Sequence, residues 1–163
     1  MSSSLVTVLL WATAIGSGLI AGLYFAFSTF IMRAFGNIDT SHAVAAMNSI
    51  NATILRSLFM PLFFGSTLIS VALVVVALLN WGQAGAGLLL ITGAIYFLGM
   101  FVCTLVFNVP LNNRLAGVNP DSADIRQVWS HYLVAWTRWN HIRTVSSLIS
   151  CLLSIWLLSA ESH

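Results

Sequence analysis

The stretch A-W-T-R-W-N-H-I-R-T, from Ala135 to Thr144, leads directly into the apolar stretch V-S-S-L-I-S-C-L-L-S-I-W-L-L-S-A, from Val145 to Ala160. The second stretch carries no charge and is typical of the end of a membrane span, which needs roughly 20 mostly apolar residues. The first places two tryptophans, two arginines, an asparagine and a histidine within ten residues. Ionisable groups in membrane segments are costly and normally face a bundle interior, where they mark function. The two stretches therefore predict one helix whose first part contributes to a polar site and whose second part crosses the membrane.

The composition of the whole chain excludes a soluble globular protein. Of its 163 residues, 59% are hydrophobic and only 6% are charged, whereas a soluble domain carries about a quarter of charged residues. The net charge of +2 is too small to suggest nucleic acid as a partner. The two cysteines, Cys103 and Cys151, lie in apolar runs without the spacing of a zinc or redox motif, so we expect buried thiols.

Four apolar runs predict four transmembrane helices with short connections, and they cover about residues 5–32, 58–79, 86–108 and 144–159. An amphipathic segment over 41–56 precedes the second run, with Ser41 placed to cap it. Pro61 is expected to bend that helix. A helix over 122–143 leads into the fourth run, and Asp121 is a suitable cap for it.

The first apolar run is uncharged throughout. It lacks the positive n-region of a signal peptide and is too long for an h-region, so we expect a membrane helix that is retained. Small residues recur at every fourth position, at Ala14, Gly18, Gly22 and Ala26. This spacing predicts a smooth helix face for close packing.

The second and fourth helices are longer than a bilayer requires. Each spans roughly 55 Å at 1.5 Å per residue, whereas the hydrocarbon core is about 30 Å thick. The side to which they project holds all six arginines, Arg33, Arg56, Arg114, Arg126, Arg138 and Arg143. By the positive-inside rule that side is cytoplasmic and both termini face outward, in a multi-pass protein of the bacterial inner membrane. The predicted fold class is all-α: one membrane domain over 1–163, an antiparallel four-helix transmembrane bundle with helices two and four extended on the cytoplasmic side.

Polar side chains from three helices converge at this cytoplasmic end. They are Asn48 and Asn51 of helix two, Asn108 and Asn112 of helix three, and His131, Tyr132, Trp136, Arg138, Trp139, Asn140, His141 and Arg143 of helix four. At about 100° per residue, Trp136, Asn140 and His141 share one broad arc that cannot all face lipid. We therefore expect an interior polar pocket, lined by Asn51, Asn108, Asn112, Asn140 and His141.

The histidines do not predict a shared metal site. His131 and His141 lie roughly 15 Å apart along one helix and cannot bind one ion together. A haem needs only one axial histidine, so His42, His131 or His141 leaves a haem protein open. A carboxylate pair is excluded, because none of the four acids lies in a membrane segment.

Four motifs are distributed along the chain: G-L-Y-F-A-F-S-T-F over 22–30, A-M-N-S-I-N over 46–51, F-N-V-P-L-N-N-R-L over 107–115 and W-S-H-Y-L-V-A-W-T-R-W-N-H-I-R-T over 129–144. Together they resemble the anthrone oxygenase-like membrane family. The resemblance implies a membrane oxygenase that converts a hydrophobic phenolic substrate, anthrone- or quinol-like, with O₂. Removal of the ring methylene proton of an anthrone gives an enolate that reacts with O₂ directly, so no cofactor is expected.

The resemblance also implies roles for the polar residues. His141 would be the base, since a histidine titrates near neutral pH. The groups expected to hold the enolate oxygen are Arg138 or Arg143, with Asn108, Asn112 or Asn140. The rings expected to stack on the substrate are Trp136, Trp139 and Tyr132.

Two other functions remain open at the level of the sequence. One is a non-enzymatic membrane protein, either a small transporter or an assembly partner. The other is a haem or quinone redox protein. In the preferred interpretation the partners are a hydrophobic small molecule, O₂ and the lipid bilayer, whereas the sequence leaves the substrate and the oligomeric state undetermined.

Overall fold

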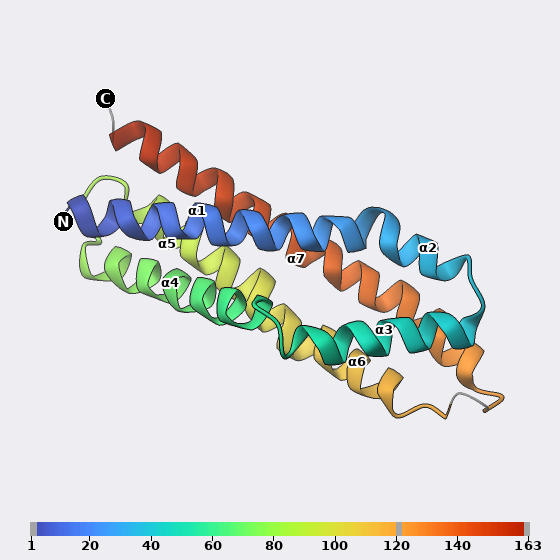
Figure 1. The fold of residues 1–163 in the computed structure, drawn as a ribbon. Helices are drawn as coiled ribbons and strands as arrows, with labels where there is room; N and C mark the ends of the chain where they lie inside the picture. The colour runs from blue at the N-terminus through green and yellow to red at the C-terminus, as the bar shows by residue number, and fades with distance from the viewer. Residues whose placement is uncertain (1–2, 120–121, 162–163) are drawn as a thin grey trace.

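The structure is a computed structural model that describes residues 3–119 and 122–161, and every regular element in this part of the chain is helical (Figure 1). The elements are α1 (Ser3–Ala26), the π-helical turn η1 (Phe27–Ile31), α2 (Met32–Gly36), α3 (Thr40–Ile54), α4 (Phe59–Leu79), α5 (Ala86–Tyr96), the π-helical η2 (Phe97–Val102) and η3 (Thr104–Asn108), α6 (Val109–Ala116) and α7 (Ile125–Glu161). The predicted all-α four-helix bundle is confirmed.

Within the described residues, four helical rods are long and apolar enough to cross a membrane, over Ser4–Gly36, Phe59–Leu79, Ala86–Ala116 and Ile125–Ala160. The chain is therefore an integral membrane protein. In the bundle α1 packs along α7, and α4 packs along α5. Figure 1 shows α1 beginning and α7 ending at the same end as the α4–α5 turn, with the α2–α3 and α6–α7 connections at the opposite end.

Hydroxyl-bearing side chains fill the interior of the bundle along much of its length. The fully buried ones are Ser17, Ser70, Thr92, Ser147, Ser150 and Ser154. Most bond to their own helix, as Ser17 Oγ does in donating to the Thr13 carbonyl at 2.6 Å. Ser150 Oγ instead donates to the Thr92 carbonyl at 2.9 Å and joins α7 to α5. Such short side chains allow close helix packing in lipid, where apolar burial gives little drive for association.

Glycines mark the closest helix approaches. A side chain added at Gly93 of α5 would meet the Ser70 carbonyl of α4 and the Val74 side chain. On α1, a Cβ at Gly18 would lie 3.3 Å from Cys151 Sγ, whereas one at Gly22 would meet nothing within 4 Å. The prediction that Gly22 belongs to the packing face of the first helix is therefore wrong, because Gly22 is exposed.

The second rod is interrupted between α3 and α4, over residues 55–58. Pro61 lies in the first turn of α4, where a backbone N–H needs no partner inside the helix. The expectation that Pro61 bends a continuous helix is therefore wrong: the break precedes the proline, and the proline helps to begin the next helix.

The caps of α3 and α7 also differ from expectation. Asp39, and not Ser41, caps α3, because Asp39 Oδ1 accepts from Ser41 N at 2.9 Å and from Ser41 Oγ at 2.6 Å. These hydrogen bonds from Ser41 lower the pKa of Asp39 below its ordinary value. Helix α7 begins at Ile125, and the expected cap Asp121 lies outside the described residues.

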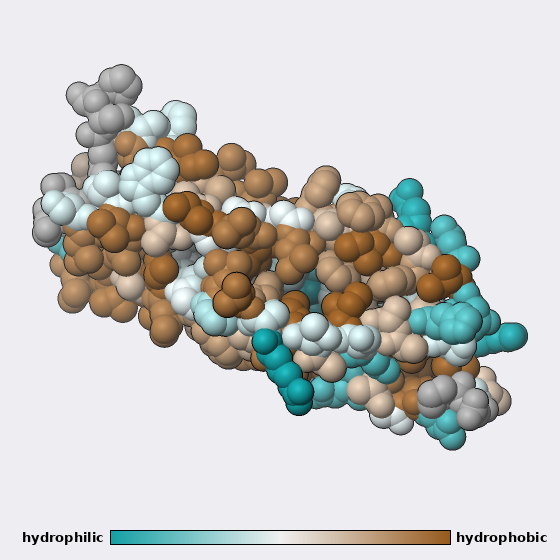
Figure 2. Space-filling view, in the orientation of Figure 1, coloured by the Kyte–Doolittle hydropathy of each residue, from teal (hydrophilic) through white to brown (hydrophobic). Residues whose placement is uncertain are grey.

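An aromatic cluster closes the end of the bundle opposite the α4–α5 turn. Its buried members include Phe27, Trp129, Tyr132 and Trp136, packed against Met47 of α3. Hydrophilic residues gather on the surface of this end, while the rest of the visible face is largely hydrophobic (Figure 2). The interior between the aromatic cluster and the apolar span holds the main cavity.

Candidate functional site

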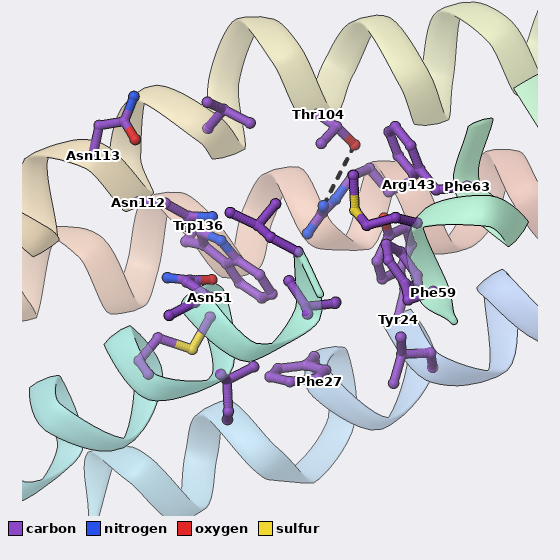
Figure 3. Close-up of a pocket in the computed structure, with 18 of the residues that line it drawn as sticks. Tyr24, Phe27, Asn51, Phe59, Phe63, Thr104, Asn112, Asn113, Trp136 and Arg143 are labelled. Atoms are coloured by element: carbon purple, nitrogen blue, oxygen red, sulfur yellow. Dashed lines mark hydrogen bonds between the residues drawn. The ribbon is translucent and has the colours of Figure 1, made fainter. Parts of the chain in front are cut away.

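A cavity of about 450 Å³ lies where α1, α3, the start of α4, the third rod and α7 meet. Most of its lining is apolar or aromatic, with Tyr24 and Phe27 from the first rod and Phe59 and Phe63 from α4 (Figure 3). The volume and lining are those of a small-molecule site, which is typically a largely apolar space with a few placed polar groups. The polar groups are gathered at its two ends (Figure 3).

Arg143 supplies the positive charge at one end. Its side chain is only 4% exposed, and its guanidinium carbon lies 4.1 Å from the centre of the Tyr24 ring and 4.9 Å from that of Trp136. Nη2 donates to Asn140 Oδ1 at 2.7 Å, and Nη1 donates to Thr104 Oγ1 at 3.4 Å. Its Nε has no hydrogen-bond partner in the described part of the chain.

Among the residues that the structure describes, no carboxylate balances this guanidinium within the cavity. None of the described lining residues is acidic, and the side chains of Asp39 and Asp124 are exposed. A buried cation is costly unless an anion or hydrogen-bond acceptors compensate it. Arg143 is therefore arranged to receive a negatively charged or strongly polar oxygen of a ligand.

Asn140 holds Arg143 in place and ties α7 to the first rod. Its Nδ2 donates to the Tyr24 carbonyl at 2.7 Å and to Ser28 Oγ at 2.7 Å, while its Oδ1 accepts from Arg143. Ser28 lies in η1, and such π-helical turns are frequent at functional sites. The asparagine is fully buried and does not line the cavity, so its role is to position the arginine.

Amide groups form the other end of the cavity, around Asn48, Asn51 and Asn112. Asn112 Oδ1 accepts from Tyr132 Oη at 2.8 Å. Among the described residues, Asn48 Oδ1 and Trp136 Nε1 are buried without a hydrogen-bond partner. Figure 3 shows Asn51, Asn112 and Trp136 close together, with Arg143 and Thr104 further along the cavity.

The structure brings part of the predicted site together. Five of the expected residues line the cavity: Arg143, Trp136, Asn48, Asn51 and Asn112. Three others are buried behind the lining: Asn140, Tyr132 and Asn108. The Nδ2 of Asn108 donates to the Trp136 carbonyl at 3.3 Å and so packs the third rod against α7. The expectation that Asn108 and Asn140 line the pocket is therefore wrong, although both support it.

Four predicted residues lie away from the cavity. His131, Arg138 and His141 are exposed, and Trp139 stacks on Phe107 with ring centres 3.5 Å apart outside the lining. The expected position of His141 is wrong because the inward face of α7 is centred near Trp136 and Arg143. At about 100° per residue, His141 then falls on the opposite side of the helix.

Several lining residues carry no signal of polarity in the sequence. They include Tyr24, Phe27, Met47, Phe59, Phe63 and Thr104. Tyr24 and Phe27 lie inside the motif over 22–30, so that motif does contain a hint of their role. Met47 likewise lies inside the motif over 46–51, whereas Phe59, Phe63 and Thr104 come from runs that are indistinguishable from ordinary membrane helix in sequence.

A family model described as anthrone oxygenase matches residues 58–153, more than half of the chain. The matched region contains Thr104, Asn112, Trp136 and Arg143, whereas the lining residues of the first rod and α3 precede it. Neither the curated proteins nor the solved structures yield a match.

Proposed function

The chain belongs to the anthrone oxygenase family, and from this premise we propose that its cavity binds a planar, hydrophobic phenolic ketone as its enolate and oxidises it with O₂. The observation that carries the proposal is Arg143, a buried guanidinium on the cavity wall with no carboxylate partner among the described residues. The enolate oxygen would take the place of the missing anion.

Arg143 would act by favouring the enolate over the ketone. A charge-assisted hydrogen bond is roughly twice as strong as a neutral one, and a water-poor cavity strengthens it further. The guanidinium therefore stabilises the charge that develops when the ring methylene loses its proton, which is the electrostatic form of catalysis. The Tyr24, Phe27 and Trp136 rings would hold the flat substrate.

The overall reaction balances without an external reductant. An anthrone loses two hydrogens from one ring carbon, and that carbon gains one oxygen atom from O₂. The second oxygen atom leaves as water together with those two hydrogens. The carbon is oxidised by four electrons and O₂ is reduced by four, so enolate and O₂ are the only reactants that the cavity needs to bring together.

The proton acceptor differs from the one expected from the sequence. The described lining contains no imidazole and no carboxylate, and His141 is on the outer surface of α7. The proton would therefore pass to water, and the contribution of the protein would be to make the bound ketone more acidic through Arg143.

The lining also suits a substrate that arrives from the bilayer. A shallower groove borders the cavity and shares Leu23, Phe27, Ile50, Ile54 and Phe59 with it. The groove lies between the first rod and the α3–α4 break, next to the exposed Leu55 and Leu58. We propose that a hydrophobic ketone dissolved in lipid passes through this groove.

The arginine distribution supports an orientation. Arg33, Arg114, Arg126 and Arg138 lie in the parts of the rods nearest the α2–α3 and α6–α7 connections, Arg56 lies in the α3–α4 break, and Arg143 lies on the cavity wall. By the positive-inside rule we assign the end with these two connections to the cytoplasmic side, with the α4–α5 turn outside. In a bacterium this arrangement corresponds to the inner membrane.

A haem-based oxygenase fits the residues less well. A haem in the cavity would need an axial ligand. His42, His131 and His141 are exposed, and none of them lines the cavity. The histidine set therefore does not suit a haem bound at this site.

The proposal is tested by substitution of Arg143 in the purified protein. Anthrone-dependent O₂ uptake and anthraquinone formation are followed together. Removal of one oxyanion donor typically costs about 100-fold or more in rate, so Arg143→Met should lower kcat/KM by at least that factor, with Arg143→Lys intermediate. His141→Ala is the matched control on the same helix and should remain close to wild type.

Three outcomes contradict the proposal or its mechanism. Full activity in Arg143→Met would show that the enolate does not bind at Arg143 in this cavity. Loss of activity in His141→Ala with an intact fold would restore the histidine as the base. Movement of anthrone across proteoliposomes without any conversion would favour a transporter.

A further inference from the structure

The hydroxyl of Tyr24 has no role in the chemistry described so far, which uses only the ring of this residue. Tyr24 lines the cavity at the end that holds Arg143 (Figure 3), and its side chain is only 5% exposed. A phenol buried in an apolar wall costs free energy unless its hydroxyl has a hydrogen-bond partner. The partners of this hydroxyl therefore indicate what it is placed to do.

The Tyr24 hydroxyl meets the same polar groups that hold the guanidinium. It is hydrogen-bonded to Thr104 and to Arg143, and the Arg143 guanidinium carbon lies 4.1 Å from the centre of the Tyr24 ring. Thr104 Oγ1 in turn accepts from Arg143 Nη1 at 3.4 Å. Three lining side chains, one each from the first rod, the third rod and α7, thus bring their polar atoms together at one point of the cavity wall.

The direction of these hydrogen bonds makes the Tyr24 hydroxyl a donor. A guanidinium can donate but cannot accept, so Arg143 cannot take the hydrogen of Tyr24. Thr104 uses its own hydroxyl hydrogen to donate to the Met100 carbonyl at 2.7 Å, so its oxygen can only accept from Tyr24. The Tyr24 O–H therefore points to Thr104 Oγ1, and a stronger acceptor beside Arg143 can take its place.

The position of Tyr24 is fixed by the asparagine that also holds Arg143. Asn140 Nδ2 donates to the Tyr24 carbonyl at 2.7 Å, and Asn140 Oδ1 accepts from Arg143 Nη2 at 2.7 Å. The Tyr24 ring also packs against Phe59, with ring centres 6.2 Å apart. Donors that are held in place before the reaction stabilise a developing charge most effectively. Tyr24 and Arg143 therefore form a pair of donors that is arranged in advance.

We propose that the Tyr24 hydroxyl is a catalytic group that donates a hydrogen bond to the enolate oxygen bound by Arg143. The inference rests on the proposed function, which places this oxygen at Arg143. An enolate oxygen is a stronger acceptor than a ketone oxygen, so the hydrogen bond strengthens as the charge develops. Thr104 keeps its bonds to Met100 and Arg143 when the Tyr24 hydrogen turns to the substrate. The exchange therefore favours ionisation of the bound ketone.

Two other titratable side chains lie near Tyr24, in addition to Arg143. They are Cys103 and Tyr96, and neither belongs to the described cavity lining. Cys103 Sγ donates to the Trp139 carbonyl at 3.7 Å. Tyr96 is buried in the same apolar cluster as Tyr24. Tyr96 therefore offers a matched control, because it is a buried phenol close to Tyr24 that does not line the cavity.

The experiment measures how readily bound anthrone ionises. Protein in lipid nanodiscs receives anthrone without O₂, and the enolate is followed against pH by its absorbance at longer wavelength. Wild-type protein should lower the pH of half-ionisation relative to protein-free nanodiscs. Tyr24→Phe keeps the ring beside Arg143 and loses only the hydroxyl, so this pH should rise by about one unit or more, a loss of about tenfold in the ionisation constant. Tyr96→Phe should match wild type.

Turnover with O₂ separates a catalytic hydroxyl from one that only supports the fold. Tyr24→Phe should lower kcat by about tenfold or more, whereas the Kd of un-ionised anthrone should change by less than about twofold, because a ketone gains little from this donor. A hydroxyl with a structural role alone would change the amount of folded protein and leave the ionisation of each bound anthrone as in wild type.

The outcomes distinguish this inference from the proposed function. If Arg143→Met raises the pH of half-ionisation and Tyr24→Phe does not, the inference is overturned and the enolate site at Arg143 stands. An equal rise in Tyr96→Phe would also overturn it. If wild-type protein ionises anthrone but consumes no O₂, the oxygenase proposal fails and the Tyr24→Phe titration still decides the role of Tyr24. If wild-type protein leaves the ionisation of anthrone unchanged, both proposals fail.

Discussion

Arg143 keeps a positive charge inside an apolar bundle through contacts that do not neutralise it. The guanidinium lies over the Tyr24 and Trp136 rings and donates to Asn140 and Thr104. A desolvated cation–π contact contributes about 2 kcal/mol, and hydrogen bonds to charged groups contribute about 1.5–3 kcal/mol. These contacts lower the cost of burial and leave the net charge available to a ligand.

At the residue scale, Asn140 offers a test of how the arginine is held. Asn140→Ala removes hydrogen bonds to Tyr24, Ser28 and Arg143 and leaves those groups buried. Hydrogen bonds between membrane helices contribute up to about 2 kcal/mol each, so we expect a loss of about 2–4 kcal/mol in unfolding free energy and a lower Tm. Unfolding in detergent, with His141→Ala as the adjacent exposed control, measures it. Equal Tm values for the two variants would contradict the role assigned to Asn140.

The sequence predicted the residue types of the site better than their positions. The cluster over 135–144 identified the polar segment and contains both Trp136 and Arg143. It did not reveal which side of α7 faces inward, because polar residues occur all around the helix there. His141 precedes Arg143 by two positions, and this offset turns their side chains apart by about 200°.

At the scale of elements, the packing of α5 on α4 depends on the absence of a side chain at Gly93. Gly93→Ala would force a Cβ against the Ser70 carbonyl, which is backbone and cannot rotate away. Overpacking of this kind costs about 1–3 kcal/mol, so Tm should fall. Gly22→Ala on α1 is the matched control, because its Cβ meets nothing within 4 Å, and alanine favours a helix over glycine by about 1 kcal/mol. A Tm for Gly93→Ala at or above that of Gly22→Ala would contradict the packing described here.

The sequence predicted that the four membrane-spanning helices exist, but it did not predict where they are interrupted. Apolar runs of membrane-spanning length identified all four rods, because so many uncharged apolar residues in a row are expected only in a helix that crosses a membrane. The break over 55–58 and the π-helical turns have no comparable signature, because they arise from contacts between rods. Pro61 was the visible breaker, and it lies at a helix start where proline is tolerated.

For the whole molecule, the orientation assigned from the arginines can be tested by labelling. Single cysteines are introduced by Gly82→Cys in the α4–α5 turn or Ile38→Cys in the α2–α3 connection, after replacement of Cys103 and Cys151 by alanine. A membrane-impermeant maleimide should modify the first variant in intact cells and the second only after permeabilisation. The reverse pattern would place the cavity on the outer side of the membrane and contradict the assignment.

The gross architecture is set by quantities that a sequence displays directly, namely apolar length and the position of arginines. The cavity depends on something less visible, the relative rotation of five helical segments. Tyr24, Asn51, Phe63, Thr104 and Arg143 come from separate elements and meet only after the bundle is formed. Their joint position could not be predicted from one chain without contacts between rods.

The wide turn η1 has a consequence for how this protein can diversify. One residue of an α-helix corresponds to about 100° of rotation. A local change in winding at η1 therefore lets the part of the first rod before the turn and the part after it each direct its own buried face toward the bundle interior. Tyr24 precedes the turn and Met32 follows it, and both remain buried. Substitutions at the lipid-exposed positions of α1 need not alter the packing of the residues that follow the turn, so ligand preference can change there while membrane insertion stays the same.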